Sequence, residues 1–566
     1  MKGEVELNTK SKIRTWFSNP SFLFWLLLLF QILIIIHYGT RKLNLFGDEI
    51  WTFNLANRYF EPFIGDASRY YNQWLDWNFW NATLTVLPEH RFSFDSVFYN
   101  QAHDVHPPLY YILIHTVCSL FPEQFSKWFG IIPNIAFFVI TQLVIWFTAK
   151  KLFFSKWSAL LVTAFYGFSW GTINNAVYVR MYAMLTVWAI LSYVLHLKMI
   201  RSFTYKHYVA ILGISFLGIM TQYYFLIYEF FLSLGFCFIL IMQKKYKDLF
   251  LYAAGFMILA GIIIWFYPPI IDQLLGRVGN QGQAAMQNMM GSNFTQRVGV
   301  FGHIISKDLF GAHIIWVFSI LIIMFFVKLF SFFGQLSIRR DIDNSRVKIS
   351  FSLHSAEIET SIKVDHLKIC LLYSLFCCLG YFCIIAKIAP YLESRYLVII
   401  HPIIIILFTY ILGKFRELYR IPKKYFIVGF FIMLALFSTK MYRADNLFSY
   451  DKNYSNINRV IAQQHSDIAF IIVTKGKSWW PTINEALTLR KVKASYMIQE
   501  DEMDSLPNIL ENYRQTHSKF LVYRGVYCKT KEAEFVKKLK SQFLGASVKK
   551  IDSFMGEVYL VDRNLT

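Results

Sequence analysis

Long apolar segments without charged residues constrain the fold of this chain more than any other feature. Two examples are Phe22–Ile36 and Ile403–Leu412. A helix needs about 20 apolar residues to cross the hydrocarbon core of a bilayer, and there it satisfies its own backbone hydrogen bonds. Of the 566 residues, 55% are hydrophobic and only 16% are charged, whereas soluble proteins carry about 25% charged residues. We therefore expect an α-helical polytopic membrane protein.

About eleven transmembrane helices are predicted from the apolar segments. They lie near residues 21–38, 130–148, 157–172, 182–198, 208–221, 224–242, 248–268, 311–330, 367–386, 396–412 and 424–439. The basic residues before the first segment resemble those of a signal peptide, but no small-residue cleavage site follows, so we interpret this segment as an uncleaved span.

Leu109–Phe121 is a further apolar stretch, and the basic loops decide how it is placed. Five basic segments lie between the spans: Lys150–Lys151, Lys198–Lys206, Lys244–Lys247, Arg339–Lys348 and Lys414–Lys424. If the N-terminus is cytoplasmic and Leu109–Phe121 does not span, all five lie in the cytoplasm, as short basic loops usually do. We therefore predict a juxtamembrane helix near 109–121 on the outer face.

This topology divides the chain into three parts. Residues 1–20 form a cytoplasmic tail, residues 21–440 the transmembrane domain with a long outer loop at 39–129, and residues 441–566 a small extracytoplasmic α/β domain. In that last part, strands are expected at Ala469–Thr474, Ser495–Ile498, Phe520–Tyr523 and Glu557–Val561, with helical patterns at Leu506–Tyr513 and Lys531–Leu539.

The composition argues against several other classes. The net charge of +21 follows from basic loops, and no basic stripe alternates with exposed aromatic residues, so no nucleic-acid partner is expected. Six of the seven cysteines lie in apolar segments, which excludes a disulfide framework. Asp341-Ile342-Asp343 is an Asp-x-Asp sequence, but the topology places it among cytoplasmic arginines. We predict no metal and no cofactor.

Two polar groups of the first outer loop are candidates for chemistry. Asp48 and Glu49 are adjacent carboxylates just beyond the first span, suited to take a proton from an attacking hydroxyl. The alternative is that they cap the helix that follows them. Asp104 and His106 precede two prolines that set an extended entry to the juxtamembrane helix; His106 is a phosphate ligand or proton carrier, or else a capping residue.

Three later turns add candidates on the same face. Arg180 and Tyr182 begin one span, Tyr223 and Tyr224 another, and Glu393-Ser394-Arg395-Tyr396 a third. An arginine at such a place suits a lipid-linked phosphate, because its planar fork pairs with two phosphate oxygens. The alternatives are an arginine that reaches lipid headgroups and an aromatic belt.

These motifs together resemble those of the GT-C glycosyltransferases of the protein-mannosyltransferase superfamily, which includes aminoarabinose transferases acting on lipid A. Three local sequences carry the match: Asp48-Glu49, His106-Pro107-Pro108-Leu109-Tyr110-Tyr111, and Arg395-Tyr396 with Pro402. Two more also fit, Arg180-Met181-Tyr182 and Gln222-Tyr223-Tyr224, and the order of the motifs agrees. The resemblance covers roughly residues 20–440. One departure is Tyr178, where the family often has a glutamate.

The resemblance implies a polyprenyl-phosphate-sugar donor and a glycan, lipid or protein acceptor on the outer face. Asp48 would be the base of an inverting transfer, with Glu49 as a second catalytic carboxylate or a positioning one. His106, Arg180, Arg395 and Tyr396 would bind the donor phosphate. Asp104, Tyr182, Tyr223 and Tyr224 would contact the acceptor or position these groups. The resemblance also implies the inner membrane of a bacterium, with the C-terminal domain in the periplasm.

The competing hypothesis is a polytopic transporter or lipid flippase. Transporters place ionisable groups near the middle of the membrane. Here the interiors of the predicted spans carry almost no charge apart from Glu229, and the candidate residues lie in outer loops. This distribution favours chemistry at the membrane surface.

Overall fold

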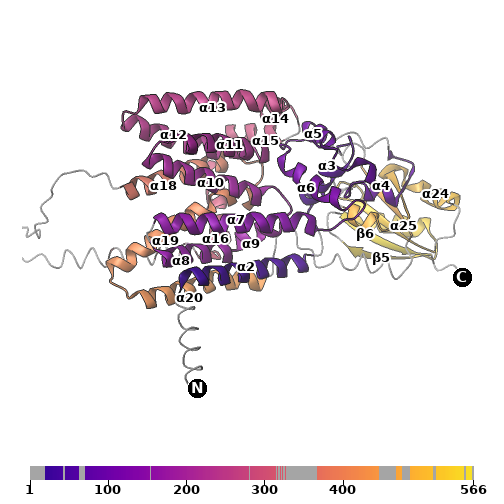
Figure 1. The fold of residues 1–566 in the computed structure, drawn as a ribbon. Coiled ribbons are helices and arrows are strands. Elements are labelled where there is room, and N and C mark those ends of the chain that lie inside the picture. The colour runs from indigo at the N-terminus through magenta and orange to yellow at the C-terminus, as the bar shows by residue number, and fades with distance from the viewer. Residues whose placement is uncertain are drawn as a thin grey trace, which may run out of the picture.

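The computed structural model describes residues 19–42, 45–62, 70–152, 155–278, 281–313, 366–444, 467–474, 485–513, 518–552 and 556–563, with isolated positions between 315 and 326. It consists of a bundle of long helices, a cluster of short helices at one end of the bundle, and a small sheet domain at that same end (Figure 1). The predicted fold class, a helical polytopic membrane protein with a small C-terminal α/β domain, is confirmed.

Within the described residues, seven helices are long and apolar enough to cross a membrane. They are α2 (Pro20–Arg41), α7 (Trp128–Leu152), α10 (Tyr182–Arg201), α12 (Tyr224–Met242), α13 (Tyr246–Phe266), α18 (His366–Ile388) and α19 (His401–Leu418). Three other predicted spans are shorter or more polar helices of the same bundle: α8 (Lys156–Phe168), α11 (Tyr205–Thr221) and α20 (Lys423–Ala444). The predicted span near 311–330 and the insert with Asp341 and Asp343 lie largely outside the described residues.

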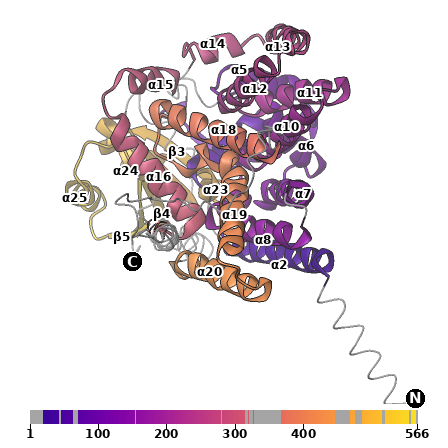
Figure 2. The ribbon, with the colours of Figure 1, turned by 90° about the vertical axis from the view of Figure 1, so that its left-hand side faces the viewer.

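The bundle is layered, with α2, α8 and α20 on one side and α11, α12 and α13 on the other (Figure 2). A buried amide pair joins the first layer to α7: Gln142 Nε2 donates to Gln31 Oε1 at 2.8 Å and to the Thr163 carbonyl at 3.1 Å. Gly167 permits this contact, because a Cβ atom there would lie 2.2 Å from the Gln31 side chain. A small residue thus lets polar groups pair inside an apolar bundle.

The predicted span near 157–172 is not one helix. Helix α8 ends at Phe168, Ser169 has extended backbone angles, and the short helix α9 (Trp170–Val177) follows. The Ser169 hydroxyl donates to the Tyr166 carbonyl, which stabilises the break by satisfying a group at the helix end. The break redirects the chain so that α9 delivers residues 178–180 to the end of the bundle.

The segment between α2 and α7, predicted as the first outer loop, forms the cluster of short helices. Its elements are α3 (Gly47–Asn57), α4 (Trp77–Asn81), η2 (Pro88–His90), α5 (Phe94–Ala102) and α6 (Leu109–Leu120). Helix α6 is the predicted juxtamembrane helix, and it lies with α3 and α5 at the end of the bundle that carries the sheet (Figure 1). At 12 residues, α6 is shorter than the helices that are long enough to cross a membrane, and its juxtamembrane placement stays a prediction.

The loop after α13 contains further helices at the same end. They are α14 (Ile270–Leu274), α15 (Gln281–Met290) and α16 (Phe294–Phe310), and the turns η3 (Ser394–Tyr396) and η4 (Val398–Ile400) precede α19. Arg297 in α16 donates to the Ala386 carbonyl of α18 at 2.7 Å, and Asp308 near the end of α16 accepts a hydrogen bond from Ser394. Helix α16 therefore links the end of α18 to the start of α19.

The C-terminal domain is built on one mixed sheet. Its strands are β1 (Trp74–Asp76), β2 (Ile468–Val473), β3 (Ala494–Gln499), β4 (Lys519–Gly525), β5 (Ser547–Asp552) and β6 (Gly556–Asp562), in the order β1-β3-β2-β4-β6-β5. The strands β3, β2 and β4 are parallel, and the others are antiparallel to their neighbours. The helical elements of the domain are α23 (Ala486–Leu489), η5 (Glu500–Ser505), α24 (Leu506–Asn512) and α25 (Glu532–Gln542).

All four predicted strands and both predicted helices of this domain are confirmed, and the sequence analysis missed β1 and β5. Strand β5 is largely exposed and charged, so it lacks the apolar pattern of a buried strand. Strand β1 belongs to the first outer loop and pairs with β3 in register Trp74 to Tyr496. The edge strand of the sheet thus comes from a distant part of the sequence. Trp80, in the helix after β1, is 415 positions before Ser495 of β3.

A buried hydrogen bond reinforces this junction. Trp80 in α4 is fully buried, and its indole Nε1 donates to Ser495 Oγ in β3 at 2.7 Å. The first outer loop and the C-terminal domain are thus packed as one unit over the end of the bundle.

We expect Ser495→Ala to destabilise this junction. The substitution leaves the buried indole N–H of Trp80 without its acceptor, which costs about 1–3 kcal/mol. Unfolding of the purified protein in detergent, followed by tryptophan fluorescence, measures the loss. The matched control is Ser541→Ala at the exposed end of α25, where a change within about 0.5 kcal/mol is expected. Equal stability of the two variants would contradict the junction.

Candidate active site

The start of helix α3 fixes the position of Asp48. The neighbouring Glu49 is fully buried and paired with Lys42 at 2.8 Å. Its Oε2 accepts the Phe46 N–H and its Oε1 accepts the Val179 N–H, each at 2.7 Å. Because both oxygens of Glu49 are used, this carboxylate holds α3 against the segment that carries Arg180. The structure thus places Glu49 as a positioning residue beside the site.

Asp48 faces two arginines. Its Oδ2 forms an ion pair with Arg395 Nη1 and accepts a hydrogen bond from the Tyr178 hydroxyl at 3.1 Å. Burial alone would raise the pKa of the Asp48 carboxyl, but the charges of Arg180 and Arg395 lower it below its ordinary value. Asp48 is therefore ionised at neutral pH. Tyr178, which the sequence marked only as a departure, is one of the groups that hold it.

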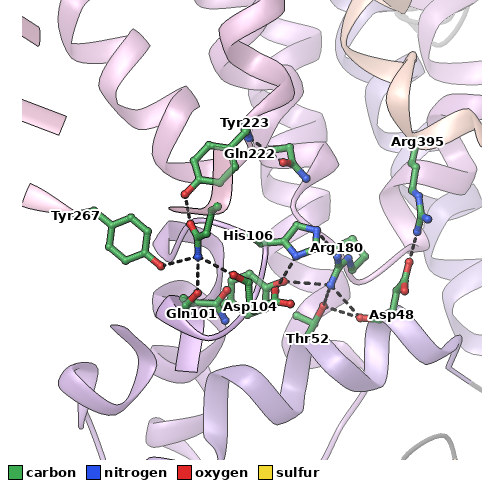
Figure 3. Close-up of polar contacts among 12 residues, drawn as sticks. Asp48, Thr52, Gln101, Asp104, His106, Arg180, Gln222, Tyr223, Tyr267 and Arg395 are labelled. Atoms are coloured by element: carbon green, nitrogen blue, oxygen red, sulfur yellow. Dashed lines mark hydrogen bonds and ion pairs between the residues drawn. The ribbon is translucent and has the colours of Figure 1, made fainter. Parts of the chain in front are cut away.

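Arg180 is the centre of a buried network (Figure 3). Its Nη1 donates to the Asp48 carbonyl, to Thr52 Oγ1 and to the Tyr111 hydroxyl, each at 3.1 Å. Its Nη2 lies 3.1 Å from His106 Nε2. The guanidinium thereby connects α3, α6 and the loop before α10. Because Arg180 is buried in these contacts, it does not extend to the lipid headgroups.

Both ring nitrogens of His106 have hydrogen-bond partners. An arginine can only donate, so His106 Nε2 accepts from Arg180 and the ring proton lies on Nδ1. Nδ1 then donates to Asp104 Oδ2 at 2.7 Å. Burial would raise the pKa of Asp104, but His106 lowers it. In this arrangement His106 links the Asp104 carboxylate to Arg180.

Gln273 of α14 pins the loop that carries Asp104 and His106. Its Nε2 donates to the carbonyls of Gln101 and Asp104, both at 2.7 Å, and its Oε1 accepts from the Tyr223 hydroxyl. Figure 3 shows the hydroxyl groups of Tyr223 and Tyr267 pointing toward the loop with Gln101 and Asp104, away from Asp48. Tyr223 therefore fixes the loop from a distance and does not line the cavity described below.

Arg395 lies in the short turn η3 before α19. Its guanidinium carbon is 5.4 Å from the ring centre of Tyr396 and 5.7 Å from that of Tyr391, so aromatic faces flank its charge. The Tyr381 hydroxyl of α18 holds the Tyr396 carbonyl at 2.7 Å, and the rings of Tyr224 and Tyr396 are 4.9 Å apart. These contacts give the turn a fixed backbone.

One cavity of about 670 Å³ collects these groups. The residues that line it are Phe46, Gly47, Asp48, Trp51, Leu55, Asp104, His106, Arg180, Tyr182, Gln222, Tyr224, Tyr391, Glu393, Arg395, Tyr396 and Tyr527. Most candidates from the sequence thus meet in one place, at the end of the bundle that faces the sheet domain. Glu49 and Tyr223 support the cavity from outside.

The two arginines of the cavity keep unused donors. The Nε atoms of Arg180 and Arg395 are both buried and have no acceptor among the described residues. A buried donor without a partner costs about 1–3 kcal/mol, so such a pair is expected to have an acceptor in the working protein. An anion with several oxygens, such as a phosphate, satisfies two guanidinium groups at once.

Several residues of the site escaped the sequence analysis. Thr52 follows the Asp48-Glu49 motif in α3 but is not part of it, and Gln273 lies in α14, a helix that contributed no motif. Tyr527 comes from the loop after β4 and brings the C-terminal domain to the cavity wall. Only the three-dimensional packing could reveal these, since each is an ordinary residue in its local sequence.

Among the residues that the structure describes, no group of three or more His, Cys, Asp and Glu side chains gathers as a metal site would require. The metal independence predicted from the sequence stays a prediction.

Comparison with known proteins gives limited similarity. No protein-family model and no curated protein matches the sequence. Among solved structures, the apo form of ArnT from Cupriavidus metallidurans shares 10% identity over 90% of this chain and 95% of that one, with a TM-score of 0.44. The form of that protein bound to undecaprenyl phosphate shares 10% identity over 92% and 97%, with a TM-score of 0.40. Similarity at this level assigns no function to the chain.

Proposed function

We propose that this chain is an integral membrane glycosyltransferase of the GT-C type. It moves a sugar from a polyprenyl-phosphate-linked donor to an acceptor on the outer face of the membrane, with inversion at the anomeric carbon. The acceptor is a glycan, a lipid or a protein, and the reaction uses no cofactor or metal.

The observation that carries this proposal is the cavity that joins Asp48 to Arg180 and Arg395. It lies at the end of a bundle of apolar helices. The proposal places this end at the membrane surface, where a lipid tail in the bilayer meets an acceptor in water. A carboxylate beside two cations with unused N–H groups is suited to a reaction in which an anionic phosphate departs from a carbon centre.

The proposed reaction assigns roles to the groups of the cavity. Arg395 and Arg180 bind the donor phosphate and stabilise the charge that grows on it as the C1–O bond breaks. His106 and Asp104 keep Arg180 in place. The ionised Asp48 faces the sugar, as the base of the acceptor hydroxyl or as a charge that stabilises the positive ring. Tyr182, Tyr224 and Tyr396 shape the walls.

The proposed location is the inner membrane of a bacterium, with the N-terminus in the cytoplasm. The basic loops support this orientation, because it places them inside. It also puts the cavity and the sheet domain together on the outer side of the membrane, where the donor sugar is presented.

The test is a release assay with the purified protein in detergent. We expect free polyprenyl phosphate, detected by mass spectrometry, when the protein receives a polyprenyl-phosphate-sugar together with envelope acceptor material. The release should persist in excess EDTA, since no metal is proposed. Release abolished by EDTA and restored by a divalent cation would contradict metal independence. A folded protein that releases nothing across a panel of donors would contradict the transferase.

A further inference from the structure

The cavity contains a carboxylate to which the sequence analysis gave no role. Glu393 lies two positions before Arg395 and lines the same cavity as Asp48. It is partly buried, and its side chain has no hydrogen bond or ion pair with any described residue. Asp48 and Asp104, the other carboxylates of the cavity, are both paired.

The backbone around Glu393 is held from two sides. The next residue, Ser394, donates its hydroxyl hydrogen to Asp308 of α16, and the Tyr396 carbonyl accepts from Tyr381 of α18. The Glu393 carbonyl accepts the Tyr396 N–H and closes the turn. A carboxylate on a fixed backbone that faces a cavity is arranged for contact with a ligand.

Asp48, in contrast, is poorly suited to accept a proton. Its Oδ2 is occupied by the Arg395 guanidinium and by the Tyr178 hydroxyl. Opposite charges at this distance favour the ionised form and weaken the carboxylate as a base. Of these two carboxylates, Asp48 is paired with Arg395, whereas Glu393 is open to a hydrogen bond from a ligand.

We propose that Glu393 is the general base of the transfer and binds the acceptor hydroxyl, while Asp48 stays ionised and stabilises the positive charge on the sugar ring. This inference rests on the proposed glycosyltransferase function. In the step, the acceptor O–H gives its proton to the Glu393 carboxylate and the oxygen bonds to the anomeric carbon. The C1–O bond to phosphate breaks, and its electron pair leaves with the polyprenyl phosphate.

The charges around Glu393 support this division. Burial raises the pKa of the Glu393 carboxyl, Asp48 raises it further, and Arg395 and Lys307 of α16 act in the opposite direction; the net shift is upward. Two carboxyl groups of one cavity are thus pushed apart in pKa, as in enzymes whose two carboxylates have separate roles. A base works in its deprotonated form, so activity falls as the pH drops through the raised pKa of Glu393.

The test uses Glu393→Gln, which keeps the size of the side chain but cannot take a proton. We expect kcat for transfer to fall about 100-fold, with loss of the acidic limb of the pH profile. The control is Asp272→Asn, which removes an exposed carboxylate of the same face that is paired with Arg277. Asp272→Asn should keep both the wild-type rate and the wild-type profile.

Azide as the acceptor distinguishes the role of the general base from the other roles in the reaction. This small nucleophile is already an anion and needs no base, so the Glu393→Gln variant should form glycosyl azide and release polyprenyl phosphate as fast as the wild type does with azide. An Asp48→Asn variant should stay inactive with azide, because the ring charge is still unstabilised.

The opposite pattern, with azide rescue of Asp48→Asn and full transfer by Glu393→Gln, would overturn the inference and leave the glycosyltransferase intact. A raised KM in Glu393→Gln with an unchanged pH profile would show that Glu393 only binds the acceptor. That result would also overturn the inference. A wild type that releases no lipid phosphate from any donor, with or without azide, would overturn the proposed function itself.

Discussion

Asp48→Asn is expected to lower the rate of sugar transfer by about 1,000-fold or more. The carboxylate is the anionic partner of Arg395 and a hydrogen-bond acceptor for Tyr178. An amide keeps the shape of the side chain but removes the negative charge that faces the sugar, so Arg395 loses its counter-charge and the positive ring its stabilising group. Release of polyprenyl phosphate per unit time measures the effect.

The folding of this variant needs its own check. Asp48 is 32% exposed at its side chain, and the fully buried anchor of α3 is its neighbour Glu49. The variant should therefore keep the elution profile and the thermal stability of the wild type. Wild-type transfer by a well-folded Asp48→Asn protein would contradict any direct role of this carboxylate.

Arg395→Gln is expected to slow transfer by about 1,000-fold, because it removes the main donor to the leaving phosphate. The fork of Arg395 contacts Asp48 and Tyr178, and its buried Nε–H has no acceptor among the described residues. We also expect a higher KM for the donor, since the phosphate is bound before it departs. Steady-state kinetics with varied donor separate the two effects.

The matched control is Arg277→Gln. Arg277 is 67% exposed and paired with Asp272 in the loop after α14, on the same face but outside the cavity. Its loss should leave kcat unchanged. An Arg395→Gln protein that matches the Arg277→Gln control in both kcat and KM would contradict the assignment of the phosphate site to this arginine.

Much of the fold could be predicted from the sequence because bilayer spans leave a simple signal. Apolar segments such as Pro20–Arg41 are long enough to be recognised by hydropathy. The basic loops between them predict which end of each span faces the cytoplasm. The break at Ser169 was missed because the stretch stays apolar on both sides, so hydropathy alone could not locate it. Strand β1 was missed because three residues of a loop acquire their strand character only by pairing with β3.

The sequence predicted most residues of the candidate site, but it predicted their individual roles less well. The motifs with Asp48, His106, Arg180 and Arg395 pointed to one face, and the structure brings these side chains together in one cavity. The residues alone did not distinguish Asp48 from Glu49, and the resemblance alone assigned the base to Asp48. Only packing shows that Glu49 is enclosed by Lys42 and two backbone N–H groups while Asp48 opens to the cavity.

His106 illustrates the same limit. Its place before two prolines suggested a phosphate ligand, but in the structure both ring nitrogens are engaged, one by Asp104 and one by Arg180. The phosphate-binding role that the resemblance implied stays a prediction for His106. The contacts favour an indirect part, in which His106 orients the Arg180 guanidinium.

The most direct measurement of the central claim follows the sugar and the lipid phosphate in one reaction. The purified protein is reconstituted in liposomes with a polyprenyl-phosphate donor whose sugar carries ¹³C, and acceptor material is added. We expect one labelled sugar on the acceptor for each polyprenyl phosphate released, in the inverted configuration. Intact labelled donor that moves between the leaflets without any labelled acceptor would contradict it and would indicate a lipid flippase.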